Sequence, residues 1–481
     1  MLSTDSGVIP PALTNFASEL PTEVPKPPYR ILLVQSAHGL FESSGGYRAN
    51  LALLRALSAQ GHAVKMIATA YERDIERLPA DVNKDKTTFG EDDLIVYRFK
   101  WDELEVVALE CETFKSIFET VEAAQRRRDW LTDHEEPPCE FQDRSDFIAQ
   151  EAQRFKPTHF IFNDQITLKT AIDNSHLAAC ARIFIAHDVQ SVPFGPYSKA
   201  VWSDCHGTDE TDTFRISQIL HGRLCQVDAL WTVSEAVKQF FETFGNLNPI
   251  HVPNHPAIYG DLEAVHVYDN YDAPYVCAIN PGVLKGFELF RETATGMPDV
   301  KFLAVRSWNT SSFVLDELKK LPNVTISEPK KDMEELWRQV KVLLVPTIFF
   351  EAFGLVVVEA MLRGIPVISS DAGGLPEAHL GVPYSIPTNL ITGALEKDPT
   401  LVEKYGIYKQ PEIDLKPWIE TLRTLLNDAA VYEDVQRRGR EQAVQYIRNL
   451  TSDDVYEGHL KDALQRRIVR EGGKPGLIRF M

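Results

Sequence analysis

Short β-rich runs alternate with longer amphipathic runs along most of this chain, and this alternation limits its possible folds more than any other feature. YRILLVQS (Tyr29–Ser36) has the composition of a buried strand, and Tyr47–Gly61 repeats apolar residues at helical spacing before a terminal glycine. AVKMIAT then reads as a second strand. A strand, a helix and a strand over this length form a βαβ unit, from which parallel sheets are built.

The same pattern continues through the first half of the chain. Further β-rich runs occur at THFIFND (Thr158–Asp164), ARIFIAHD (Ala181–Asp188) and ALWTVS (Ala229–Ser234). They predict an open, doubly wound sheet. Between residues 71 and 154 the periodicity weakens and charged residues increase, which predicts peripheral helices and loops there.

A second series of alternating runs follows His251–Gly260, whose prolines, asparagine and glycine are typical of a connection between domains. Its strand candidates are YVCAINP, VKFLAVRS, NVTISEP, KVLLVPT and IPVISSD. The chain is therefore predicted to be an α/β protein with two doubly wound domains. We expect a Pro-rich tail over residues 1–28, domains over 29–252 and 253–452, and a C-terminal helix over 453–481 that could pack on either domain, including back on the N-terminal one.

Composition narrows the range of partners. The formal charge of -19 disfavours nucleic acid, because phosphate backbones are bound by clustered Lys and Arg, and it disfavours strong association with anionic membranes. The 6 cysteines have no metal-ligand spacing, so we expect reduced thiols, no metal site and a cytoplasmic protein. The N-terminal tail lacks the features of a signal peptide, and the chain has no apolar run of membrane-spanning length. The sequence leaves the oligomeric state open.

Two carboxylates bracket the segment between the strand candidates KVLLVPT and IPVISSD. Glu351 precedes an apolar run and Glu359 follows it, and a helix is expected to begin near Gly354, because a parallel crossover needs one. The first amides of that helix, at Gly354, Leu355 and Val356, would be donors suited to a diphosphate. The alternative is that Glu351 caps the helix and Glu359 is a surface residue. DAGGLPE, at the end of the next strand candidate, favours a ligand site.

FEAFGLVVVEAM followed by GIPVISSDAGGLPE resembles the donor-site signature of the retaining GT-B glycosyltransferases of family GT4, the glycosyl transferases group 1. Other elements stand in the family's order: the Gly45–Gly46 loop, IFIAHD, WTVSEAVKQFF, VPNHP and PGVLKGFELF. The resemblance covers the chain from Tyr29 to about Leu464. It implies two Rossmann-like domains facing each other across a cleft.

The resemblance also implies roles for individual residues. Catalytic roles fall on His187, Lys285 and Glu351, with Lys285 neutralising the departing diphosphate and Glu351 holding the hydroxyls of the donor sugar. Glu359 would bind the nucleotide ribose. The remaining donor-binding residues expected are Gly46, Phe353, Gly354, Leu355 and Val356.

One position departs from the family pattern. Most relatives have an arginine five residues before the lysine, where this chain has Asn280, and Arg306 at the end of the next strand candidate is the substitute we expect. His38 and Asp164, at strand ends of the first domain, are acceptor-side candidates. Aromatic residues within Pro193–Trp202 are compatible with an apolar acceptor or with core packing.

The sequence therefore predicts a retaining glycosyltransferase that moves a hexosyl group from a nucleoside diphosphate sugar, with a UDP-sugar such as UDP-glucose favoured, without a cofactor or bound metal. The acceptor is not identified, a small metabolite being one option, and neither is the type of glycosidic bond. Alternatives are a nucleotide-sugar epimerase, a glycosyl phosphorylase or a non-catalytic sugar-nucleotide-binding protein, since fold does not fix function. A dinucleotide-dependent oxidoreductase is disfavoured, because SAHGLFESSGG is not GxGxxG.

Overall fold

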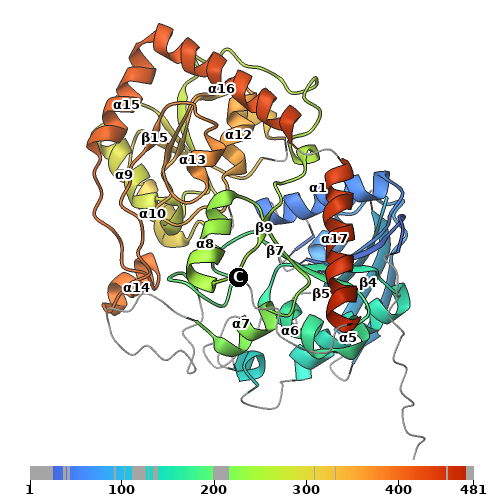
Figure 1. Ribbon diagram of the computed structural model, residues 1–481. Helices are drawn as coiled ribbons and strands as arrows, with labels where there is room; N and C mark the ends of the chain where they lie inside the picture. The colour runs from blue at the N-terminus through green and yellow to red at the C-terminus, as the bar shows by residue number, and fades with distance from the viewer. Residues whose placement is uncertain are drawn as a thin grey trace, which may run out of the picture.

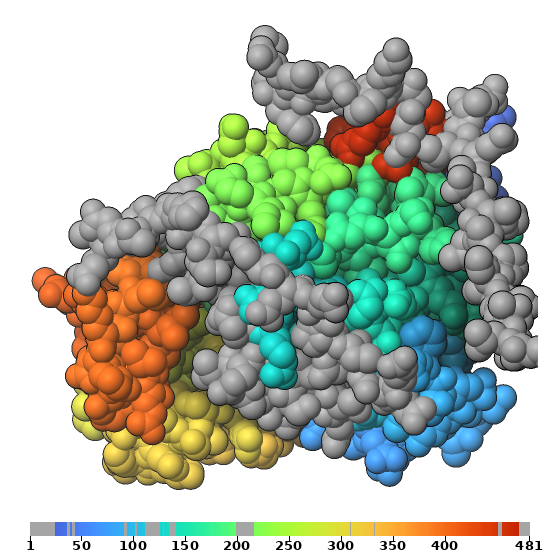
Figure 2. Space-filling view, turned by 90° about the horizontal axis from the view of Figure 1, so that it is seen from below, coloured from blue at the N-terminus to red at the C-terminus, as the bar shows by residue number. Residues whose placement is uncertain are grey.

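The computed structural model describes residues 25–35, 39–40, 44–90, 94–101, 103–110, 126–127, 129–133, 139–198, 216–307, 309–330, 332–450 and 453–472. Within these ranges two parallel-rich sheets, each flanked by helices, lie side by side (Figure 1). The space-filling view from below shows the C-terminal domain, in yellow and orange, beside the N-terminal domain, in green to blue (Figure 2). None of the described helices is long and apolar enough to cross a membrane.

The described part of the N-terminal sheet has 9 strands in the order β3-β4-β5-β2-β1-β6-β7-β8-β9. Its strands are β1 (Arg30–Val34), β2 (Ala63–Ala70), β3 (Asp85–Phe89), β4 (Leu94–Trp101), β5 (Leu104–Glu110), β6 (His159–Phe162), β7 (Ala181–Ala186), β8 (Ala229–Thr232) and β9 (Ile250–His251). The helices of this domain are α1 (Gly45–Ala59), α2 (Glu72–Glu76), α5 (Cys139–Phe155), α6 (Gln165–Asp173), α7 (Gln218–Leu224) and α8 (Glu235–Gly245). Strands β1, β2 and β6 to β9 are parallel, as the βαβ pattern predicts.

The prediction of only helices and loops between residues 71 and 154 was wrong, because β3, β4 and β5 extend the sheet there. β5 pairs parallel with β2 and antiparallel with β4, and β4 pairs antiparallel with β3. Several of the charges that hid these strands, such as Lys100 and Glu105, lie at exposed positions. Lys100 and Glu103, for example, form an ion pair of 2.6 Å at the turn between β4 and β5. The apolar residues between those charges enter the core.

In the C-terminal domain, the sheet drawn from the described residues has 6 strands in the order β12-β11-β10-β13-β14-β15. Its strands are β10 (Tyr275–Ile279), β11 (Phe302–Val305), β12 (Val324–Ser327), β13 (Val340–Val345), β14 (Val367–Ser370) and β15 (Ser385–Ile386). The helices are α9 (Phe287–Gly296), α10 (Ser312–Leu318), α11 (Glu334–Trp337), α12 (Leu355–Leu362), α13 (Leu375–Ala378), α14 (Pro399–Tyr405), α15 (Lys416–Asn427) and α16 (Ala429–Asn449). The predicted strand candidates all form strands, and the helix expected from Gly354 begins at Leu355.

Helix α17 (Asp453–Gly472) returns from the C-terminal domain to pack against the N-terminal sheet beside β7 (Figure 1). Its Tyr456 and Leu460 are buried in the N-terminal core. The ring of His159 in β6 forms a hydrogen bond of 2.9 Å with the carbonyl of Leu460. Arg467 donates to the carbonyl of Ala178. The N-terminal core is thus completed by the end of the chain.

The two domains also contact each other through a cluster of aromatic side chains. Tyr197 packs on Phe349 and Phe240, and it donates a hydrogen bond of 2.9 Å to the carbonyl of Ile391. Tyr408 donates to the carbonyl of Tyr197 at the same distance. Phe194 and Tyr197, within Pro193–Trp202, are therefore packed in the core, which was one of the two alternatives for this stretch. Trp202 lies outside the described residues.

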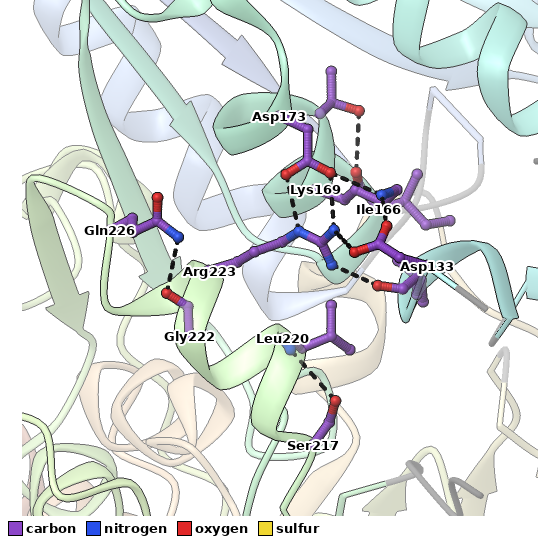
Figure 3. A network of polar contacts seen from close by, with 11 residues as sticks. Asp133, Ile166, Lys169, Asp173, Ser217, Leu220, Gly222, Arg223 and Gln226 are labelled. Atoms are coloured by element: carbon purple, nitrogen blue, oxygen red, sulfur yellow. Dashed lines mark hydrogen bonds and ion pairs between the residues drawn. The ribbon is translucent and has the colours of Figure 1, made fainter. Parts of the chain in front are cut away.

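A polar network fixes the outer helices of the N-terminal domain (Figure 3). Arg223 in α7 donates to both carboxylate oxygens of Asp173 at the end of α6, at 3.0 and 2.9 Å, and to Asp133 at 2.6 Å. Lys169 in α6 also pairs with Asp133, at 2.5 Å. The network ties α6 and α7 to residues 129–133.

Candidate functional site

A cavity of about 550 Å³ lies between the carboxyl ends of the two sheets. Such a position is where ligands bind in open α/β proteins. From the N-terminal domain and the connection it is lined by Ser44, Gly45, Gly46, Arg48, His187, Val233 and Asn254. The C-terminal domain contributes, among others, Asn280, Lys285, Arg306, Glu351, Phe353, Gly354, Leu355, Val356 and Glu359. The predicted donor-binding and catalytic residues are therefore brought together around one cavity.

The first turn of α12 faces this cavity. Gly354 precedes the helix with φ of 104°, a left-handed conformation that favours glycine, and a Cβ there would lie 2.6 Å from Leu375. Gly354 therefore contributes no capping side chain, and Glu351 does not cap the helix as the alternative supposed. Amides at the start of a helix are donors without partners inside the helix, and they suit an anion.

Lys285 and Glu351 form an ion pair at the edge of the cavity, with 2.5 Å between Nζ and Oε2. Lys285 ends a single 3-10 turn, Val283–Lys285, and is followed by Gly286 with φ of 83°. A Cβ at Gly286 would lie 1.7 Å from the carbonyl oxygen of Pro346. The glycine thus allows the lysine turn to sit directly against the loop after β13 that carries Glu351.

Glu359 lies one helical turn into α12 and is not a surface residue. Its side chain is only 12% exposed, and its Oε1 lies 2.5 Å from Nη2 of Arg48 in α1. The charge of Glu359 raises the pKa of Arg48. This ion pair joins the two domains across the cavity.

His187 follows β7 and faces the cavity from the N-terminal domain. Asn50 donates to Gln35, so its carbonyl oxygen is free to accept from Nε2 of His187, at 2.7 Å. Burial lowers the pKa of His187 to about 4, an effect that the nearby charge of Asp188 opposes. The imidazole is therefore neutral near pH 7, with Nδ1 as its acceptor nitrogen. Gly46 lets the loop before α1 approach, since a Cβ there would lie 3.0 Å from Cβ of His187.

Asn280 and Arg306 lie on the same wall of the cavity. Asn280 has φ of 58°, a left-handed conformation that asparagine tolerates better than arginine does. Arg306 follows β11, is 43% exposed and forms an ion pair of 3.0 Å with Glu328. Arg306 is thus placed to supply positive charge to the cavity, although Glu328 shares that charge.

The acceptor-side candidates are less well supported. Asp164 accepts hydrogen bonds from the amide and hydroxyl of Thr167, at 2.9 and 2.6 Å, and so caps α6. It is not among the residues that line the cavity. Asp164, just after the end of β6, therefore serves as the N-cap of α6. His38 lies outside the described residues.

Arg48 and Asn254 line the cavity but were not predicted to do so. Asn254 lies in VPNHP, which was noted as an interdomain connection and as a family element without a role at the site. Arg48 lies three residues after Gly45, so it shares the cavity-facing side of α1 with the glycine loop. Helical spacing could have placed it near the cavity, but its partner on another domain could not be read from the sequence.

Comparisons with known proteins agree with this arrangement. Residues 281–394 match the family model described as Glycosyl transferases group 1. The D-inositol 3-phosphate glycosyltransferase of Mycobacterium sp. (strain KMS) is 32% identical over 114 residues, 22% of this chain and 25% of that protein. The alpha-1,3/1,6-mannosyltransferase alg-2 of Neurospora crassa is 28% identical over 174 residues, 35% of this chain and 31% of that protein. These matches span about a quarter to a third of the relatives.

Solved structures resemble the chain over nearly its whole length. The sucrose-phosphate synthase of Thermosynechococcus elongatus aligns with a TM-score of 0.57 at 17% identity, over 92% of this chain and 98% of that one. Anabaena Alr3699/HepE in complex with UDP-glucose aligns with a TM-score of 0.58 at 13% identity, over 91% and 99%. Part of the C-terminal domain thus matches the glycosyl transferases group 1 model, and the chain has the GT-B fold, with two Rossmann-like domains facing each other across the cavity.

Proposed function

We propose that this protein is a retaining glycosyltransferase that moves a hexosyl group from a nucleoside diphosphate sugar to an acceptor. The observation that carries the proposal is the position of two carboxylates, Glu351 and Glu359, on either side of the first turn of α12, with Lys285 beside the first of them. The amides of that turn would bind the diphosphate, Glu359 the ribose and Glu351 the sugar hydroxyls.

A diphosphate leaves readily only if its growing negative charge is met by fixed positive charge and donors. Lys285 would supply the charge, and the α12 amides would supply donors. Arg306, on the same wall, would add a second cation in place of the arginine that relatives have at the position of Asn280. With these groups in place the reaction is proposed to need no bound metal.

His187 would contact the donor sugar as a neutral hydrogen-bonding group, held by Asn50. The bond from the anomeric carbon to the diphosphate oxygen breaks, and the nucleoside diphosphate leaves with the electron pair. The acceptor oxygen attacks from the same face, its proton passes to the departing phosphate, and configuration is retained. Exclusion of water by the closed cavity would limit hydrolysis of the donor.

UDP-sugars such as UDP-glucose are the proposed donors, and Anabaena Alr3699/HepE, which was solved with UDP-glucose, supports that choice by likeness of fold. A cytoplasmic location is part of the proposal, and the free thiols of Cys180, Cys225 and Cys277 are compatible with a reducing compartment. The acceptor lies on the side of His187 and the Gly45–Gly46 loop. A small metabolite is the acceptor class proposed.

A thermal-shift panel of UDP-, GDP- and ADP-sugars tests the donor class, because a ligand that binds only the folded state raises the melting temperature. We expect a clear shift with UDP-glucose or another UDP-sugar. Transfer to a mixture of candidate acceptors is then followed by mass spectrometry, and anomeric configuration by NMR. The proposal is contradicted if no nucleotide sugar binds, if the donor is converted without an acceptor, or if the product is inverted.

A further inference from the structure

Helices α1 and α12 meet at their N-terminal ends across the cavity. A Cβ at Gly45, the first residue of α1, would lie 3.3 Å from Cδ1 of Leu355, the first residue of α12. Arg48 and Glu359 lie three and four residues further along the same helices, which is one turn in each case. Their ion pair of 2.5 Å therefore repeats, one turn deeper, the contact between the first residues. The part of a bound nucleotide next to its diphosphate would therefore lie near both Arg48 and Glu359.

Glu359 is a largely buried carboxylate beside a proposed diphosphate site, and such a group needs a cation. Without one, its negative charge would be costly to keep out of water and would repel the donor. Arg48 meets this need from the other domain, and it binds Oε1. A carboxylate has two oxygens, so Oε2 can still accept from a ribose hydroxyl.

The connection between the domains reaches the same place. The 3-10 turn Pro256–Tyr259 packs against α1. Tyr259 is 5% exposed, and its hydroxyl interacts electrostatically with Tyr446, Glu359 and Arg48. Burial raises the pKa of Tyr259, and Tyr446 and the charge of Glu359 add to this effect. The connection therefore places a buried hydroxyl beside the ion pair.

We propose that Arg48 is a positioning residue for the donor ribose: it holds the carboxylate of Glu359 from the opposite domain, so that the ribose site is complete only when the two domains meet. This inference rests on the proposed function. It adds to the donor site a residue of the N-terminal domain that acts through Glu359. The affinity for the donor then depends on contact between the two domains, and binding of the donor in turn favours that contact.

The test is a double-mutant cycle on the affinity for UDP, or for GDP or ADP if the donor panel selects one, measured by isothermal titration calorimetry on the full chain. Arg48→Ala should weaken binding about tenfold, the usual cost of losing a hydrogen bond to a charged group. Arg48→Lys, which keeps the charge, should recover part of that loss. In a Glu359→Gln background, Arg48→Ala should change the affinity less than about twofold, because the carboxylate that it orients is gone.

Tyr408→Phe is the matched control. Tyr408 of the C-terminal domain donates a hydrogen bond of 2.9 Å to the carbonyl of Tyr197 in the N-terminal domain, so it also joins the two domains. It does not line the cavity. The affinity of Tyr408→Phe should stay within about twofold of wild type, because it removes one contact between the domains without touching the ribose site. Arg48→Gln serves the same comparison if Arg48→Ala does not fold.

The role of Arg48 is overturned if Arg48→Ala binds UDP like wild type, if it loses affinity equally in both backgrounds, or if Tyr408→Phe loses as much. Failure of the wild-type protein to bind any of the three nucleotides would contradict the proposed function itself. The wild-type titration therefore separates the two failures.

Discussion

Nζ of Lys285 lies 2.5 Å from Oε2 of Glu351, so the cation proposed for the diphosphate and the carboxylate proposed for the sugar neutralise each other before any donor is bound. Both side chains are partly exposed to the cavity, at 31% and 21%. A donor that binds here would therefore break the ion pair between Lys285 and Glu351. It would replace that contact with one from Lys285 to its diphosphate and one from Glu351 to its sugar hydroxyls.

Replacing Lys285 should affect the reaction rate far more than the fold. Lys285→Ala is expected to lower kcat by about 10²- to 10³-fold, the usual cost of losing one group that stabilises the departing charge. Because the ion pair is partly exposed, the free energy of unfolding should change by less than about 1 kcal/mol. Turnover and urea denaturation of the same preparation check both statements. Wild-type turnover in a folded variant would remove Lys285 from the mechanism.

Chelation should leave the reaction unaffected. Positive charge from Lys285 and donors at the start of α12 are proposed to do the work that a divalent ion does in metal-dependent transferases. Activity with excess EDTA should match activity without it, within error. A strict requirement for added Mg²⁺ or Mn²⁺ would show that this set of residues is insufficient.

Acid should destabilise the protein before its carboxylates titrate. Burial lowers the pKa of His159, His187 and His379 to about 4, from 6.5. Below pH 6.5 the unfolded chain binds protons at these positions that the folded chain does not, so stability is complete above pH 6.5 and falls toward pH 4. Each pKa unit corresponds to about 1.4 kcal/mol at most.

Urea denaturation at pH 7.5, 6.5, 5.5 and 5.0 measures this dependence. The free energy of unfolding should be flat above about pH 7 and decline progressively below pH 6.5, where Asp and Glu still contribute little. His379→Gln, at a position that is only 2% exposed, should make the decline shallower. A constant free energy over this range would count against buried neutral histidines.

Gly286 should tolerate no side chain. A Cβ there would lie 1.7 Å from the carbonyl oxygen of Pro346, and φ of 83° is unfavourable for alanine. Gly286→Ala should cost at least about 2 kcal/mol of stability. Gly458→Ala is the matched control, because Gly458 lies in helix α17 with open space around it. It should be neutral or gain up to about 1 kcal/mol. Equal melting temperatures for both variants would contradict the predicted clash.

The sequence was sufficient where one local pattern decides the structure. Buried apolar runs between turn residues identified the strands of the second domain, and the need for a parallel crossover identified helix α12. It was insufficient where the pattern is mixed. Lys100 in β4 and Glu103 in the turn before β5 lie beside buried residues, and their charge outweighed the β-rich composition in our interpretation.

The site shows the same division. Lys285 and Glu351 could be predicted to lie close together because they follow neighbouring parallel strands, β10 and β13, which end at the same edge of the sheet. Glu359 lies near them because it belongs to the first turns of the crossover helix that follows Glu351. Arg48 and Glu359 are separated by 311 positions and belong to different domains, so only the packing of one domain on the other brings them together. Asp164 was predicted to be near the acceptor because it follows a strand, but its carboxylate caps α6 instead.

The return of α17 to the first domain has a consequence for how the protein is made. Tyr456 and Leu460 fill the N-terminal core, yet they are synthesised after the whole C-terminal domain. During synthesis, the apolar face that α17 covers therefore stays exposed until the last helix has been made. The N-terminal domain cannot complete its folding before the C-terminal domain has been synthesised. Both ends of the C-terminal domain are also joined to the N-terminal domain, so any movement between the two domains has to bend both connections.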